Sequence, residues 1–560
     1  MTRFVLISDS TLSYEYRNFP LLDFLPCAPG KAIPERVYKF LKGPAPPAKP
    51  NGETVFAPYA IRKLEASLLT KFKREEIAVA HEDYLENFVK DDTEIIAVST
   101  MDPLGIGPTT MSYYALFGGN LDAWVRRDWD KLMDRINVVR KGKKAKLIVG
   151  GPGVWEFTIL RDEIEKYHYD YVFSGEADDI APMLFDQIAS GDIDKNVFRT
   201  GFVSYDENFK RVTINDPLFL SRGFSKAAYP RLEEIPRIVA PSMKGMVEVM
   251  RGCGVGCDFC EVTLRPLRYE PTENVVAELE INAAAGITNG WLHSDEFFGY
   301  KHGNLFAPNE EALSELLTAV MNVKGIKTSN PTHGRVSIPA GYPEMMEKLS
   351  KILKTGPRNW IGIQTGVETG SDELAKKHMP NKTLPLRIGP DGSWLDIVWQ
   401  GVYVETKNYW RPAFTLQVGQ NEETEDDNWQ TVEMINRLSN SYSEGGRPFE
   451  FTVTPLVNVP LGRIKSRSLN TNMLTKDMMA VYYASYRHLS KMATRDGFRD
   501  TDGNFLSRIG TGSLISGGGY LMMKYIEKRA AKMGVDIEKV KHYGVEHSRE
   551  ITSLSALARA

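Results

Sequence analysis

Short apolar runs alternate with helical patterns along most of this chain of 560 residues, in two successive series. In the first series each run is rich in β-forming residues and ends in small or turn-forming ones. Runs of this kind, separated by helical stretches, are typical of a parallel sheet with helices on both faces. We therefore predict a doubly wound, Rossmann-like α/β domain over residues 1–190, with strand candidates beginning at Phe4, Glu75, Glu94, Ala145 and Tyr169.

The second series indicates a barrel over residues 241–470. Six βα units predict a partial (βα)6 barrel of the TIM type, with its active site at the carboxyl ends of the strands. Residues 191–240, rich in Pro and Arg, are expected to form a linker or small subdomain, and 380–412 an insertion. A mainly helical C-terminal domain is expected over 471–560, with a break at 516–520. The barrel strand candidates are Met246–Met250, Gly290–Ser294, Ile326–Ser329, Trp360–Thr365, Phe414–Val418 and Phe449–Pro455.

Composition excludes several classes of protein. The formal net charge is −3 and no long run has one sign, so we expect neither a nucleic acid nor a membrane partner. The N-terminal segment is a poor signal peptide, and no run of about 18 apolar residues predicts a membrane span. Four cysteines are too few for a disulfide framework in a chain of 560 residues, which favours the reducing cytoplasm.

Three of these four cysteines lie within eight positions, in the stretch RGCGVGCDFC that begins at Arg251. The spacing is Cys253-x3-Cys257-x2-Cys260, and the glycines let the loop curl so that the thiolates converge on one inorganic centre. Three thiolates are one fewer than a closed [4Fe–4S] cluster or a structural zinc site takes, so one position would stay open for chemistry. Zinc, or free thiols beside a tight turn, are the alternatives. Cys27 is expected to be a small core residue.

The pattern C-x3-C-x2-C, with the aromatic Phe259 before the last cysteine, resembles the signature of radical S-adenosylmethionine (SAM) enzymes. The resemblance implies that the three thiolates hold a [4Fe–4S] cluster whose open iron chelates the amino and carboxylate groups of SAM. Residues 361–377, 416–435 and 451–462 are similar to the family's fourth, fifth and sixth strand segments. The barrel and the cysteine loop therefore point to the same family.

The resemblance also implies SAM contacts at the ends of the strands. The family carries a short glycine–glutamate motif for the SAM amino group after its second strand, where this chain has HSDEFFG. We assign Asp295 and Glu296 to that role, although the motif departs from the family's pattern. The expected SAM-binding residues are Phe259, Asp295, Glu296, Gln364 and Glu368.

The N-terminal domain resembles the cobalamin-binding domain that precedes the barrel in one large radical SAM subfamily. The phrases LIVGGPGVWEF and DYVFSGEADDIAPML are similar to its last two strands and loops, and the strand ends are small, glycine-rich or hydroxyl-bearing. A generic doubly wound domain for a nucleotide is the alternative. The expected cobalamin-binding residues are Ser10, Thr11, Ser99, Thr100, Asp102, Gly105, Gly150, Gly151, Gly153, Gly175 and Glu176.

One element of that subfamily is missing. Many cobalamin domains carry Asp-x-His-x-x-Gly after the first strand, and the loop here reads SDSTLSYEY, without a histidine. His81, after the second strand candidate, is expected to be a surface or core residue. We therefore predict cobalamin without a protein histidine beneath the cobalt.

The two resemblances together imply a C-methyltransferase that uses SAM, a [4Fe–4S] cluster and cobalamin. One SAM methylates cob(I)alamin, and a second yields a 5′-deoxyadenosyl radical that abstracts hydrogen from an unactivated sp3 carbon. The carbon radical then takes the methyl group from methylcobalamin. Residues 56–69 and 99–108 are similar to a branch of cobalamin-dependent radical SAM proteins that includes peptidyl C-methyltransferases. The specific target expected is a glutamine of methyl-coenzyme M reductase.

The partners follow from this chemistry, and two rival functions stay open. A protein or peptide substrate and a low-potential electron donor of the ferredoxin or flavodoxin type are expected. One rival is a radical SAM enzyme that forms a C–C bond or ring on a lipid or small metabolite. The other is a non-enzymatic corrinoid or iron–sulfur carrier, which would gain nothing from an open iron. A methylthiotransferase is rejected because only Cys27 remains for an auxiliary cluster.

Overall fold

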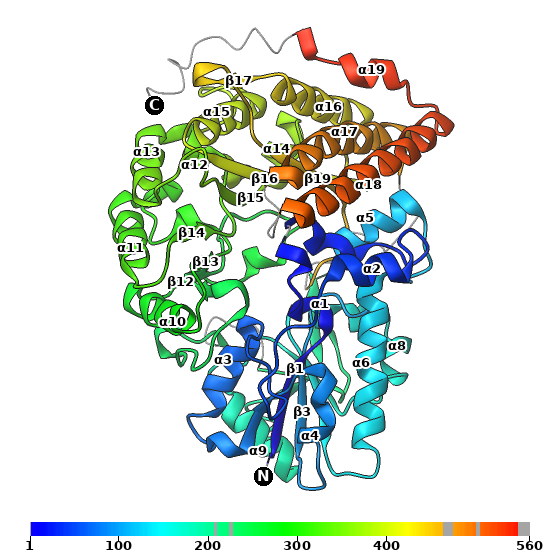
Figure 1. Ribbon diagram of the computed structural model, residues 1–560, viewed down its shortest axis with the longest axis vertical. Coiled ribbons are helices and arrows are strands. Elements are labelled where there is room, and N and C mark those ends of the chain that lie inside the picture. The colour runs from blue at the N-terminus through cyan, green and yellow to red at the C-terminus, as the bar shows by residue number, and fades with distance from the viewer. Residues whose placement is uncertain are drawn as a thin grey trace.

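The computed structural model describes residues 2–18, 20–205, 210–222, 228–462, 474–499 and 505–546. An N-terminal α/β domain lies below a larger barrel, and two long C-terminal helices lie side by side next to the barrel (Figure 1). None of the helices in these ranges is both long and apolar enough to span a membrane.

The N-terminal sheet has seven strands in the order β2-β1-β3-β4-β5-β9-β6. All neighbouring pairs are parallel except β9 and β6. This arrangement confirms the predicted doubly wound domain. The strands are β1 (Phe4–Ser8), β2 (Ile77–Val79), β3 (Ile95–Ser99), β4 (Lys146–Gly150), β5 (Tyr171–Ser174), β6 (Arg199–Thr200) and β9 (Phe219–Ser221).

Helices cover both faces of this sheet because alternate residues of each strand point to opposite sides. Phe4 and Leu6 of β1 pack in one cluster with α3 (Tyr59–Leu68) and α9 (Ala181–Ser190). Val5 and Ile7 pack in another with α6 (Trp124–Arg140). All four side chains of β1 are at most 1% exposed, which explains the unbroken apolar run in the sequence.

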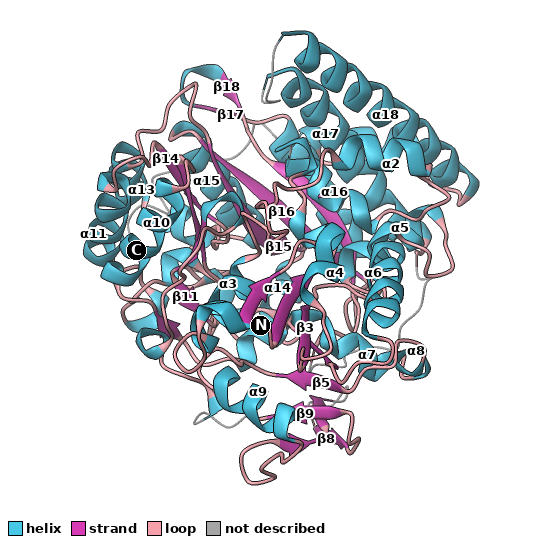
Figure 2. Cartoon of the chain, turned by 60° about the horizontal axis from the view of Figure 1, so that its bottom comes forward, coloured by secondary structure: helices cyan, strands magenta, loops and turns pink. Residues whose placement is uncertain are grey.

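The sheet continues beyond residue 190, where the sequence suggested a linker. Strands β6 and β9 supply its last two members, and a short hairpin of β7 (Phe202–Tyr205) and β8 (Arg211–Ile214) lies between them in the chain. Figure 2 shows β5 and β9 beside each other, with α9 nearby. These strands have only two to four residues, too few for a periodic signal to separate them from a loop.

Six parallel strands form the barrel, in two sheets of order β10-β13-β14 and β15-β16-β19. A parallel bridge between His333 and Gln364 joins the two sheets. The arrangement confirms the predicted partial (βα)6 barrel. The strands are β10 (Met246–Glu248), β13 (Asn289–His293), β14 (Thr328–Pro331), β15 (Ile361–Glu368), β16 (Trp410–Val418) and β19 (Thr452–Val457).

The outer layer of the barrel consists of helices between successive strands, and its interior is open. On β15, Ile361 and Ile363 are buried against the helices, whereas Gly362 and Gln364 are exposed although the strand is central. The inward-facing side chains therefore border accessible space. The outer helices are α10 (Thr272–Ala284), α11 (Glu310–Asn322), α13 (Pro343–Ile352), α15 (Trp394–Lys407) and α16 (Glu425–Ser439).

Three expectations about the second half of the chain were wrong. Residues 380–412 are not an insertion, because α15 is the outer helix between β15 and β16, and β16 begins at Trp410 rather than Phe414. Trp394 and Trp410 are fully buried, so the aromatic run belongs to the core. The glycines at 516–520 do not break the chain, since α18 (Phe505–Lys532) runs through them.

The C-terminal helices pack on the barrel and on the N-terminal domain. Helix α17 (Lys476–Arg499) lies against α16 and β19, and its Met479, Tyr482 and Tyr486 are buried. On α18, the Arg529 guanidinium donates to the carbonyl of Ala115 in the N-terminal domain, at 2.7 Å. One apolar cluster therefore extends from the N-terminal sheet through the barrel to α17.

Candidate active site

The cysteine loop is held by a short antiparallel pair, β11 (Met250–Arg251) and β12 (Arg268–Tyr269), at the mouth of the barrel. Gly252, Gly254 and Gly256 have φ values of +80°, +71° and +86°, in the region that glycine alone adopts readily. A Cβ on Gly252 would lie 2.5 Å from the Pro266 carbonyl oxygen. The glycines that alternate with the cysteines are therefore required by the turn itself.

Cys257 is buried, whereas Cys253 and Cys260 are half-buried. Burial raises the pKa of all three, that of Cys257 to about 12, and the charges of Glu296 and Asp295 oppose ionisation further at Cys253 and Cys260 respectively. Cys257 couples electrostatically to both of the other cysteines, so the three side chains are neighbours. A cationic metal centre would reverse this preference and bind the thiolates.

The donor set fits a cluster better than a single metal ion. Among the described residues, no three Cys, His, Asp or Glu side chains are arranged to hold one metal ion. A [4Fe–4S] cluster distributes its thiolates over different iron atoms, so they need not meet at one point. The only cysteine outside the loop is Cys27, whose thiol lies beside Thr110 in the N-terminal domain. Burial raises the pKa of Cys27 to about 12.

The residues after β13 occupy two different environments. Asp295 accepts a hydrogen bond from the Gly252 backbone N–H at 2.7 Å, which places its carboxylate beside the cysteine loop. Glu296 is 3% exposed and pairs with Arg335, whose Nε lies 3.2 Å from its Oε2. Asp295 is the better placed of the two to meet a ligand at the loop, because it contacts the loop backbone directly.

Glu368 lies at the end of β15, at a β-bulge and with φ of +67°. Its carboxylate forms an ion pair with Lys382 at 2.8 Å, and both side chains are about nine-tenths buried. Burial by itself would lower the pKa of Lys382, but Glu368 and the Cys257 thiol raise it, and the net shift is upward. The Lys382 ammonium lies 5.9 Å from the centre of the Phe259 ring.

Lys382 was missed in the sequence. It lies in a stretch that resembled an insertion, and no local pattern distinguishes it from the other lysines. Gly366 was the available signal, because a Cβ there would lie 2.5 Å from the Lys382 Nζ and would displace it. The structure thus brings Cys257, Cys260, Glu368 and Phe259 together around one buried cation.

Imidazole and amide groups border the barrel interior next to Asp295. The rings of His293 and His333 are 6.4 Å apart, and Gln364 is bridged to His333 through the backbone. The His333 Nδ1 lies 3.0 Å from the Ser294 carbonyl oxygen, to which it donates, so its Nε2 is the acceptor nitrogen. Burial, followed by the proximity of His293, lowers the pKa of His333 and keeps the ring neutral.

The residues expected to bind cobalamin collect at one edge of the N-terminal sheet, because β1, β3, β4 and β5 are adjacent and parallel. Several of them pack loop against loop. A Cβ on Gly151 would lie 2.6 Å from the Thr100 carbonyl oxygen, and one on Gly153 would lie 2.5 Å from that of Met101. These glycines permit close approach of the loops after β3 and β4, rather than of a ligand alone.

Other expected cobalamin contacts are engaged within the protein. Asp102 accepts hydrogen bonds from the Gly107 N–H and the Thr110 hydroxyl. Ser10 donates to Asp128 at 3.0 Å, in a buried group that includes Lys42. Thr11 bonds to Asp9, and Glu176 pairs with two arginines of the barrel. Of the expected set, Gly175 borders open space, with no described atom within 4 Å of a Cβ built on it.

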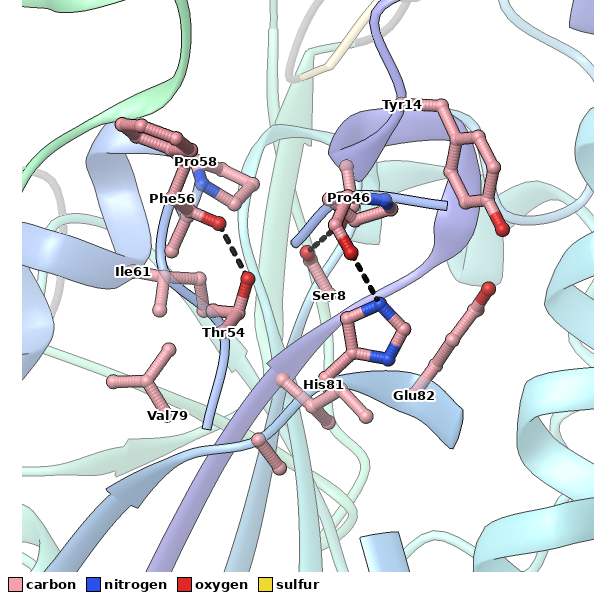
Figure 3. Close-up of a pocket in the computed structure, with 14 residues that line it drawn as sticks. Ser8, Tyr14, Pro46, Thr54, Phe56, Pro58, Ile61, Val79, His81 and Glu82 are labelled. Atoms are coloured by element: carbon pink, nitrogen blue, oxygen red, sulfur yellow. Dashed lines mark hydrogen bonds between the residues drawn. The ribbon is translucent and has the colours of Figure 1, made fainter. Parts of the chain in front are cut away.

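A pocket of about 340 Å³, open in part to solvent, lies at the carboxyl ends of β1 and β2 (Figure 3). His81 lines it, and both ring nitrogens are used within the protein, by the Pro46 carbonyl at 3.1 Å and the Asp83 N–H at 3.1 Å. The neighbouring Glu82 is half-buried, and desolvation raises its pKa to about 7. His81 thus has a structural role, as expected, and the first-strand loop supplies no histidine.

Comparison with known proteins identifies this two-part arrangement. A solved structure of TsrM, a radical S-adenosylmethionine methyltransferase from Kitasatospora setae with cobalamin and a [4Fe–4S] cluster bound, aligns with 95% of this chain and 100% of that chain. The TM-score is 0.52 and the sequence identity 13%. The chain has the fold of a cobalamin-binding radical SAM methyltransferase. TsrM with tryptophan substrate and the SAM analogue aza-SAM aligns with 86% of this chain and 77% of that chain, with a TM-score of 0.50 and 14% identity.

Sequence comparison finds relatives that match between half and three-fifths of this chain. No family model matches the chain. The tRNA-2-methylthio-N(6)-dimethylallyladenosine synthase of Phocaeicola vulgatus is 22% identical over 302 residues, 51% of this chain and 59% of the relative. That of Bacteroides fragilis is 24% identical over 341 residues, 58% of this chain and 67% of the relative. The chain therefore spans only about three-fifths of the first relative's length.

Proposed function

We propose that this protein is a cobalamin-dependent radical SAM C-methyltransferase. The observation that carries the proposal is the contact between the cysteine loop of the barrel and the edge of the N-terminal sheet where β5 ends. The loop with three cysteines follows Arg251, and the Arg251 guanidinium lies 2.7 Å from Glu176 in the loop after β5 of the N-terminal sheet. The edge that would take a corrin and the loop that would take a cluster therefore border the same space, as a methyl transfer between their ligands requires.

The side chains divide the binding roles among themselves. Cys253, Cys257 and Cys260 would hold the [4Fe–4S] cluster and leave one iron open to SAM. When bound, the cluster and cobalamin supply the radical-generating and methyl-carrying chemistry. Lys382 presents a buried cation that suits the SAM carboxylate, and Asp295 presents an anion that suits the amino group. The buried pair of Glu368 and Lys382 keeps the thiol side of the site polar without admitting bulk water.

The lining of the barrel interior supports a substrate with a neutral hydrogen-bonding group. The neutral His333 ring is hydrogen-bonded to the Gln364 side chain, whose amide keeps a further donor and acceptor for a ligand. A carboxamide matches this set, and the target we propose is a glutamine side chain in a peptide, such as that of methyl-coenzyme M reductase. A low-potential ferredoxin- or flavodoxin-type protein would reduce the cluster in the cytoplasm.

The test is anaerobic incubation of the reconstituted full-length protein with SAM carrying a deuterated methyl group, cobalamin, a low-potential reductant and a glutamine peptide. We expect release of 5′-deoxyadenosine and a deuterated methyl group on a carbon of the peptide. Cys257→Ala should abolish the iron–sulfur absorption and all 5′-deoxyadenosine release, whereas Cys27→Ala should retain both. Release that survives Cys257→Ala would contradict the proposal. Release without peptide methylation would favour a small-molecule substrate.

A further inference from the structure

A buried ionic cluster joins the two domains directly behind the cysteine loop. The Arg251 guanidinium contacts Glu176 and Asp178, each at 2.7 Å, and Glu248 at 2.6 Å. Arg268 binds both carboxylate oxygens of Glu176, at 2.6 and 2.8 Å. All five side chains are 16% exposed or less. We refer to these five residues as the interdomain ion cluster.

The members of this cluster come from both domains. Glu176 and Asp178 follow β5 of the N-terminal domain, at the edge where we place cobalamin. Arg251 on β11 and Arg268 on β12 are register partners in the pair that holds the cysteine loop. Arg251 is separated from Cys253 by one glycine. The loop after β5 thus binds both strands from which the cysteine loop projects.

A second, separate group of buried contacts crosses the same boundary between the two domains. Lys63 and Tyr59 of α3 bind the Glu278 carboxylate of the barrel helix α10, at 2.9 and 2.7 Å. The side chains of Lys63 and Glu278 are each 1% exposed. The contact between the domains is therefore fixed by charges at two separate places.

Buried ion pairs of this kind contribute more to geometry than to stability. Desolvation of the charges offsets most of their attraction, and well-packed apolar residues would stabilise the boundary equally well. Unlike an apolar residue, arginine has a planar guanidinium that can donate two parallel hydrogen bonds to a carboxylate, which fixes the orientation of the pair. The bidentate contact of Arg268 and the single contact of Arg251, both to Glu176, fix the distance and the angle between the loop after β5 and the cysteine loop.

We propose that Arg251 and Arg268 are positioning residues that hold the cysteine loop in register with the cobalamin edge of the N-terminal domain. They act through Glu176 and Asp178. The inference rests on the proposed function for its chemical meaning, because it concerns the spacing between cluster and corrin. The mechanical link itself exists in the chain without either cofactor.

The first test measures that link in the full-length protein as purified, by amide hydrogen exchange. Arg268→Gln removes the charge and the bidentate contact but keeps a similar length. We expect exchange in residues 252–260 to rise by about tenfold, while the β16 core stays protected. Arg231→Gln is the matched control, because Arg231 forms an exposed pair with Glu233 on the same domain boundary segment and should change nothing.

A second variant protects the test against misfolding. Glu176→Gln keeps the shape of the shared carboxylate and removes its charge, so it should raise exchange in the same segment. Arg268→Lys keeps the charge without the planar guanidinium, and we expect it to behave like Arg268→Gln if geometry decides. Unchanged exchange in both Arg268→Gln and Glu176→Gln overturns the proposal, as does full protection in Arg268→Lys.

The reconstituted protein supplies a readout that a merely structural role would not move. Reduced [4Fe–4S] cluster and cob(II)alamin each carry an unpaired electron, so their magnetic coupling reports the distance between them. We expect Arg268→Gln to weaken and broaden this coupling at unchanged iron and cobalamin content. The ratio of 5′-deoxyadenosine released to methyl groups transferred should rise several-fold. An unchanged coupling overturns the proposal, whereas absence of cobalamin binding in the unaltered protein would count against the proposed function alone.

Discussion

The cysteine loop and the loops of the N-terminal sheet are both rich in glycine, but the glycines have different structural roles. In the cysteine loop, positive φ values at Gly252, Gly254 and Gly256 turn the backbone so that three thiols lie together. In the N-terminal loops, Gly151 and Gly153 let two backbones approach each other closely. The first pattern brings three thiols together within ten residues, whereas the second packs two loops against each other.

The largest effect that would test this contrast is expected at Lys382, the cation of the cysteine region. Lys382→Met leaves Glu368 buried without its partner and removes the group proposed for the SAM carboxylate. We expect SAM cleavage to fall about 100-fold, equivalent to about 2.7 kcal/mol. The 5′-deoxyadenosine assay measures it. Lys377→Met, which breaks an exposed pair with Glu422, is the control and should leave the rate within about twofold.

A variant that keeps the positive charge at position 382 tests whether that charge is what SAM cleavage needs. Lys382→Arg keeps the charge, and we expect it to recover part of the rate. A rate close to that of the unaltered protein in Lys382→Met would show that the buried pair only supports the fold.

An intermediate effect on stability is expected from a methyl group added in the N-terminal loops, compared with one added on an open face of the barrel. In Gly153→Ala the new Cβ would lie 2.5 Å from the Met101 carbonyl oxygen, which forces the two loops apart. We expect a loss of about 2–3 kcal/mol in the free energy of unfolding. Gly362→Ala, on the inner face of β15, meets no described atom within 4 Å and should cost less than about 0.5 kcal/mol. Urea titration measures both, and equal losses would remove the contrast.

The smallest effect on stability is expected from two buried carboxyl groups, each of which has a raised pKa. Burial raises the pKa of Glu405 on α15 and of Glu156 in the N-terminal domain well above the ordinary value of 4.5, and Asp102 adds to the shift of Glu156. Glu156 accepts from the Leu104 N–H at 2.7 Å, whereas the Glu405 Oε2 has no partner among the described residues. The folded state therefore keeps a proton on each that the unfolded state loses above its own pKa.

Stability should thus decrease as the pH rises through the window above about 4.5, where the folded chain binds more protons than the unfolded chain. Glu405→Gln removes this loss, and we expect it to stabilise the protein at pH 7 by about 1 kcal/mol and to flatten the dependence on pH. Thermal unfolding between about pH 5 and pH 8 measures the slope. A steeper slope in the variant would show that Glu405 is ionised in the folded state.

The accuracy of the sequence analysis differed between the same two regions. All six barrel strands exist where the sequence predicted a strand, because each lies between turn signals, but β16 begins four residues earlier than expected, at Trp410 rather than Phe414. Helix α15 was mistaken for an insertion, since its tryptophans gave no clear helical period. In the N-terminal domain, Ser10 and Glu176 lie at strand ends as expected, but each is bound to distant residues, Asp128 and Arg251 among them.

The sequence by itself determined the alternation of strands and helices, and the loop in which three cysteines stand between glycines. Both are local properties, set by side-chain periodicity and by backbone conformation over a few residues. Only the tertiary structure decided that Lys382 lies beside the thiols and that Arg251 and Arg268 bind Glu176, which is 75 and 92 residues away from them. Burial and charge pairing depend on which distant segments meet, and no local pattern encodes that choice.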